Sequence, residues 1–141
     1  MSDGSFELQA AVYSTLSGLT PALAAGGVHA PAAQDTPLPS VEIDDSDAVS
    51  ADVVGRHGLT ETLNIHVWSV VHPPTGDGGY VTVKKIISRI RDALHAQKLT
   101  VSGQSYAFAN VSSTRIFNDA DETAIHGVVT LTVTHFGAEV S

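Results

Sequence analysis

Residues 60–71 read TETLNIHVWSVV, and this stretch decides the kind of fold. Leu63, Ile65 and Val67 occupy alternate positions, with more polar residues between them. Successive side chains of a β-strand point to opposite faces of the sheet, so the alternation predicts a strand with one buried face. The other face of this strand carries Thr62, Asn64, His66 and Trp68.

Other segments show strand patterns on both sides of this one. Val41 and Ile43 alternate with acidic residues and predict a strand over 40–46. Two long alternating segments near the C-terminal end predict an antiparallel hairpin with its turn at 118–122. These segments are residues 106–117 and 124–136, and shorter strands are expected at Val28–His29 and Leu99–Val101.

Two segments have the spacing of amphipathic helices. Residues 5–17 place apolar side chains near helical intervals, with Ser5 as the expected cap and Gly18 as the end. Residues 79–96 form the second predicted helix, with a single apolar stripe. This stripe consists of Val83, Ile86, Ile87, Ile90 and Leu94.

The order of these elements predicts an α+β fold, an antiparallel sheet with two helices packed on one face. With 141 residues, the chain fits a single domain spanning residues 1–141. The segments between the elements are expected to be loops. They are the Pro- and Gly-rich residues 19–39, an exposed acidic excursion over 44–59, and the Gly-rich residues 72–79.

Composition excludes several classes of function. The formal net charge of −8 argues against a nucleic-acid binder, whose affinity comes mainly from Lys and Arg, although DNA could still pass through an acidic channel without adhering. There is no cysteine, which excludes disulfides and thiolate chemistry. No secretory signal or apolar membrane span is found, so we expect a protein made in the cytoplasm that does not contact a membrane.

No set of residues has the spacing of a catalytic or cofactor site. The seven histidines include no metal-binding pair on a helix, and the serines include no nucleophile elbow. His66 and His126 lie on the polar faces of two predicted strands and could be neighbours. Two histidines lack the further ligands that zinc requires, so we expect surface or interface imidazoles, no metal and no enzyme.

The charged residues separate into two groups that could serve as docking surfaces. An acidic loop contains Asp44, Asp45, Asp47 and Asp52 and could line a lumen or dock a neighbour. A basic helix face, together with Trp68, is the candidate subunit interface. That face consists of Lys84, Lys85, Arg89 and Arg91.

Taken in order, these segments resemble the small tail-completion or tail-terminator proteins of long-tailed phages and gene transfer agents. The resemblance covers nearly the whole chain and is carried mainly by the HVWS strand and the ALH helix end. The similar segments are LQAAVYSTLSG (8–18), TPLPSVEI (36–43), TETLNIHVWS (60–69), IRDALH (90–95), LTVSG (99–103) and HGVVTLTV (126–133).

The resemblance implies an α+β subunit that forms a ring, commonly a hexamer, at the head-proximal end of a tail tube. Its implied partners are other copies of itself, the major tail tube protein and a head–tail connector or stopper protein. DNA would only pass through the lumen. Two other interpretations stay open: a head-side adaptor or stopper, and a small ligand- or metal-binding α+β domain using the two histidines.

Overall fold

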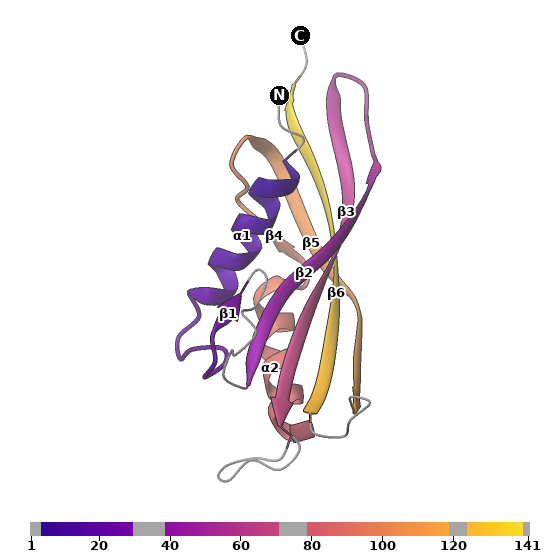
Figure 1. Ribbon diagram of the computed structural model, residues 1–141. Helices are drawn as coiled ribbons and strands as arrows, with labels where there is room; N and C mark the ends of the chain where they lie inside the picture. The colour runs from indigo at the N-terminus through magenta and orange to yellow at the C-terminus, as the bar shows by residue number, and fades with distance from the viewer. Residues whose placement is uncertain (1–3, 30–38, 71–78, 119–123, 140–141) are drawn as a thin grey trace.

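The computed structural model describes residues 4–29, 39–70, 79–118 and 124–139 (Figure 1). Two helices and six strands follow one another along these residues. In chain order they are α1 (Ser5–Ser17), β1 (Val28–His29), β2 (Ser40–Ser50), β3 (Arg56–Val70), α2 (Gly79–Leu94), β4 (Gln97–Lys98), β5 (Gln104–Asn118) and β6 (Ala124–Glu139).

The six strands form one sheet in the order β1-β2-β3-β6-β5-β4. All neighbouring pairs are antiparallel except β1 and β2, which run parallel. Both helices lie on the same side of this twisted sheet (Figure 1). The predicted α+β architecture is therefore confirmed.

The core lies between the sheet and the two helices. The predicted buried face of β3 is confirmed, since Leu63, Ile65 and Val67 are at most 1% exposed. The stripe of α2 packs on the central strands, and its approach depends on Gly127 of β6. A Cβ atom on Gly127 would lie only 2.7 Å from the Val83 side chain, so a glycine is needed where the helix meets the sheet.

Helix α1 has the predicted bounds and buries Leu8, Val12 and Leu16. Ser5 does not cap it, because Gly4 holds the N-cap position with a φ of 89° and no side-chain cap bond. The Ser5 hydroxyl instead donates a hydrogen bond to a distant carboxylate, described below. Gly18 ends the helix as predicted.

The predicted acidic excursion over 44–59 is wrong for most of its length. β2 continues to Ser50 and β3 begins at Arg56, so the acidic residues lie in a long β-hairpin. The hairpin forms because this part of β2 pairs with the first half of β3, from Ser46 opposite Leu63 to Ser50 opposite Leu59. Pairing across the hairpin overrides the low strand propensity of aspartate.

Four smaller predictions also need correction or fall outside the described residues. The short strand expected at Leu99–Val101 lies instead at Gln97–Lys98. The second helix ends at Leu94 rather than at residue 96, because Ala96 has a positive φ of 56° that a helix cannot contain. The turn at 118–122 and the loop at 72–79 lie almost wholly outside the described residues.

Candidate assembly surfaces

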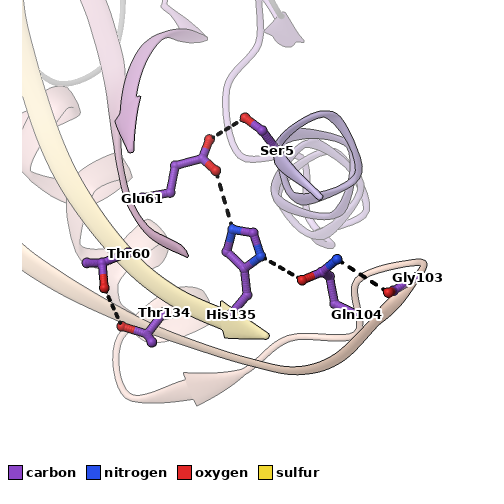
Figure 2. Close-up of polar contacts among 7 residues, drawn as sticks. All are labelled: Ser5, Thr60, Glu61, Gly103, Gln104, Thr134 and His135. Carbon is purple, nitrogen blue, oxygen red and sulfur yellow. Dashed lines mark hydrogen bonds and ion pairs between the residues drawn. The ribbon is translucent and has the colours of Figure 1, made fainter. Parts of the chain in front are cut away.

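A buried polar network connects the start of α1 to the sheet (Figure 2). Glu61 of β3 and His135 of β6 are 1% and 0% exposed, and His135 Nε2 lies 3.4 Å from Glu61 Oε1. The Ser5 hydroxyl donates to Glu61 Oε2 at 2.8 Å, and His135 Nδ1 lies 2.9 Å from Gln104 Oε1. Four residues far apart in sequence thereby fix the first turn of α1 over three strands.

No prediction from the sequence included this network, although the strand pattern held a signal for it. Glu61 lies two residues before Leu63 and therefore on the buried face of β3, and His135 lies two residues after the buried Val133. A charged residue in the apolar register of a strand needs a buried partner. Only the sheet register, which pairs Glu61 with Val133 and so sets Glu61 and His135 diagonally across the same face, identifies that partner.

On the helix-free face, the structure brings His66 and His126 together as predicted. His66 Nδ1 and His126 Nε2 lie 2.8 Å apart, and the His126 ring stacks on Trp68 with centroids 3.7 Å apart. Phe117 of β5 contacts the same ring edge-on at 4.8 Å. Trp68 is thus half-buried in an aromatic cluster on the open face of the sheet.

The metal-binding interpretation of these histidines gains no third ligand from the described residues. Asp44 Oδ2 is 3.9 Å from His66 Nε2, which is an ion-pair distance and not a coordinating arrangement. In the described ranges, no group of three or more His, Cys, Asp or Glu side chains could hold a metal ion. The pair fits stacking and hydrogen bonding across the two central strands.

The predicted acidic group lies along one margin of the sheet. Asp44 and Asp47 are exposed on β2, and Asp52 is exposed just after it; the Asp45 side chain lies outside the description. The Gly58 backbone N–H donates to Asp52 Oδ1 at 2.9 Å. This hydrogen bond, helped by nearby His57, lowers the pKa of the Asp52 carboxyl below its ordinary value.

The predicted basic face lies on α2, away from the sheet. Lys84, Lys85 and Arg91 are exposed, whereas Arg89 is half-buried and already used within the chain. The Arg89 guanidinium donates to two backbone carbonyls in the segment after α1, at 2.7 and 3.1 Å. The role of this face as a subunit interface, and that of Trp68, stays a prediction.

Large apolar side chains are exposed at several places on the described surface, including α1 and the β2–β3 hairpin. Phe6 and Tyr13 of α1 are 80% and 41% exposed and border open hollows beside the helix. Val53 and Val54, beside the hairpin turn between β2 and β3, are 52% and 104% exposed. These side chains are candidate contacts for other proteins.

No helix among the described residues is long and apolar enough to cross a membrane. The described surface combines exposed apolar side chains with separated acidic and basic groups. The chain belongs to the tail completion protein gp17 family, whose model matches residues 10–135. It is accordingly a phage tail structural protein.

A solved structure has the same fold. It is a chain of the virion of a native gene transfer agent particle, with a TM-score of 0.76 and 20% sequence identity. The match covers 92% of this chain and 95% of the other. No curated protein sequence matches the chain.

Proposed function

We propose that this protein is a tail terminator, the subunit of a ring that caps the tail tube and joins it to the head connector. The observation that carries the proposal is the family match over residues 10–135. The shared fold with a chain of a gene transfer agent virion supports a place in a phage or phage-derived particle. The ring is proposed to be a hexamer at the head-proximal end of the tail.

A terminator needs two unlike docking surfaces, because one must match the tube and the other must not let the tube grow further. The exposed apolar groups of α1 and of the β2–β3 hairpin lie on different elements and would supply two such surfaces. The net charge of −8 favours a lumen that DNA crosses by repulsion instead of adhesion. The proposed partners are therefore the major tail tube protein and the head connector.

Tail length tests the proposal directly. Particles assembled without this protein should carry tubes longer than normal and of variable length, and adding the purified protein should restore a uniform length. Electron microscopy measures both. The mass of the purified protein, measured alone and with its tail tube protein, should reveal a ring.

Other outcomes would identify the alternatives. Tails of normal length that fail to join heads would indicate a head-side adaptor or stopper. A strict monomer that associates with no tail tube protein would refute the ring. Zinc retained by the purified protein and lost on replacing His66 and His126 with Ala would support the metal-binding interpretation.

A further inference from the structure

One outer edge of the sheet is covered over only part of its length. β1 pairs with β2 at Val41 and Glu42 alone. From Ile43 to Ser50, no described residue pairs with the outer side of β2, and this part of the strand is largely exposed. We call residues 43–50 the β2 free edge. A long uncovered edge is a template for pairing with another strand.

The opposite edge of the sheet has a matching gap. β4 pairs with β5 only at Phe108 and Ala109, and the Val111 N–H donates to His95 Nδ1 at 3.0 Å. Among the described residues, nothing pairs with the outer side of β5 after this point. We call residues 112–118 the β5 free edge.

The two gaps lie in opposite halves of the sheet. Ile43, Ile65, Val129 and Thr114 share one row across the four long strands. The β2 free edge extends from this row toward the hairpin, whereas the β5 free edge extends mainly the other way, toward Asn118. The short strands β1 and β4 cover the remaining halves. β2 and β5 also run in opposite directions, since three antiparallel pairings separate them.

We propose that the ring closes by antiparallel pairing of the β2 free edge of one subunit with the β5 free edge of a second copy of this chain. The inference rests on the proposed ring and says how its subunits meet. Because the two edges differ, the contact is head-to-tail and repeats from subunit to subunit. The sheet then continues from one copy to the next through the two long strands β2 and β5.

The ends of the free edges determine the register. Without any displacement, the partner's Thr114 would lie opposite Ile43, because both residues share one row of the sheet. With the neighbour displaced by four residues along the strands, the partner's Asn118 lies opposite Ile43, immediately beyond the end of β1. At the other end, the partner's Val111 lies opposite Ser50, the last residue of β2. The N–H of Val111 already donates to His95 of its own chain, so the pairing ends there. A displacement of two would bring the partner's Asn118 opposite Val41, which β1 already covers.

The backbone hydrogen-bonding pattern fits this register. The Val41 N–H points away from β3 and donates to the Gly27 carbonyl. The N–H of Ile43 therefore also points away from β3, as do those of Ser46 and Ala48, which follow a β-bulge between Ile43 and Ser46. On β5 the Val111 N–H points away from β6. A β-bulge lies between Val111 and Ser113, and beyond it the N–H groups of Thr114 and Ile116 point away from β6 as well. The displacement of four sets outward residues opposite one another, with Ala48 opposite the partner's Thr114. An even displacement also keeps each face of the sheet on its own side.

The charges favour this pairing over a two-fold one. Residues 43–50 contain three aspartates and no basic residue, whereas Arg115 is the only charged residue from 112 to 118. In the proposed register Asp47 lies directly opposite the partner's Arg115, on the helix-free face. Pairing two β2 free edges would bring aspartates together, and pairing two β5 free edges would bring arginines together. Like charges directly opposite destabilise a strand pair.

Cysteine cross-linking tests the register, because the native chain has no cysteine. In the proposed pairing Val49 faces the partner's Ser113 as a non-hydrogen-bonded pair, and the Cα separation of about 4.5 Å in such pairs permits a disulfide. The double variant Val49→Cys/Ser113→Cys should give a ladder of covalent oligomers on oxidation, ending at the closed ring. Both side chains are exposed, so folding should be preserved.

The control Val49→Cys/Thr114→Cys moves one cysteine to the other face of the sheet and should give no ladder. Covalent dimers from Val49→Cys alone or Ser113→Cys alone would show two-fold pairing and overturn the inference. A ladder from the control that equals that of the test pair would also overturn it.

Charge exchange provides an independent measurement on the full chain. Asp47→Arg or Arg115→Asp alone places like charges opposite each other and should weaken ring association at least about tenfold. The double variant Asp47→Arg/Arg115→Asp should restore it, as measured by mass at several concentrations. Circular dichroism checks that each variant is folded.

The outcomes separate this inference from the proposed function. The edge pairing is refuted if the ring forms but the Val49–Ser113 ladder does not, and the double charge variant associates no more strongly than the single variants. This outcome does not contradict the proposed terminator function. A chain that stays monomeric with its tail tube protein refutes both.

Discussion

The buried Glu61–His135 pair offers the sharpest test of how the fold is held together. Replacing Glu61 with Ala removes the carboxylate that the Ser5 hydroxyl and the His135 ring both contact (Figure 2). His135 is 0% exposed, so its ring has no contact with bulk solvent. The variant therefore leaves a buried polar group without its partner and loosens the first turn of α1.

The size of the effect follows from burial and distance. Breaking a buried charged pair costs about 3–5 kcal/mol, and leaving a neutral buried donor unsatisfied costs about 1–3 kcal/mol. The 3.4 Å separation is long for a hydrogen bond, whereas the 2.8 Å bond from Ser5 is strong. We expect Glu61→Ala to lower the free energy of unfolding by about 2–4 kcal/mol, a large part of the stability of a small domain.

Thr60→Ala is the matched control. Thr60 precedes Glu61 in the same strand, but its side chain is half-buried on the opposite face, where its hydroxyl lies 3.4 Å from that of Thr134. This variant should cost less than about 1 kcal/mol. Urea unfolding followed by circular dichroism measures both variants, and an unchanged slope shows that the change is one of stability.

A double-mutant cycle completes the test. If Glu61 and His135 stabilise the fold together, His135→Ala should cost less in the Glu61→Ala background than alone, with a coupling of about 1–3 kcal/mol. Equal costs for Glu61→Ala and Thr60→Ala, or purely additive losses in the cycle, would refute the reasoning.

Three further predictions concern the core and the hairpin. Gly127→Ala should destabilise the protein by about 1–3 kcal/mol, because the added Cβ would lie 2.7 Å from the Val83 side chain of α2. Gly137→Ala is the control and should not destabilise it, because the atom nearest to its added Cβ would be 3.7 Å away. Thermal unfolding compares the two variants. Leu131→Ala should cost about 2–5 kcal/mol by leaving a cavity under a fully buried side chain, as measured in urea, and a cost below 1 kcal/mol would contradict the close packing. Because the pKa of Asp52 is lowered on folding, its contact with Gly58 stabilises the hairpin fully above about pH 4 and is lost as the pH falls through the lowered value. The NMR shift of the Gly58 amide should follow this titration of the Asp52 carboxyl. Asp52→Asn should abolish that titration.

The sequence predicted the parts of the fold that follow local rules. The alternation in β3 and the stripe on α2 identified both elements and their buried faces, because burial repeats with the period of each element. The strand character of residues 46–50 could not be predicted in this way. It depends on pairing with β3, and exposed aspartates carry no local signal for such pairing.

The same distinction applies to the candidate surfaces. The meeting of His66 and His126 was predictable because both lie on the polar faces of strands that turned out to be neighbours. The contact of Arg89 with the segment after α1 was not, since it joins residues more than sixty positions apart. The two free edges could not be predicted from the sequence either. They depend on how many residues of β2 and β5 are paired with the short strands β1 and β4.

The sheet order has a consequence for synthesis and folding. β6 follows every other described strand in the sequence, yet it lies in the middle of the sheet, between β3 and β5. Until β6 has been made, β3 and β5 lack their common neighbour and His135 is missing from beneath α1. A nascent chain can form local hairpins and helices during this time, but its core stays incomplete and depends on contacts that span most of the sequence. Folding of this protein is therefore expected to finish only when translation has passed residue 139, so that chains interrupted before this point are substrates for chaperones and proteases.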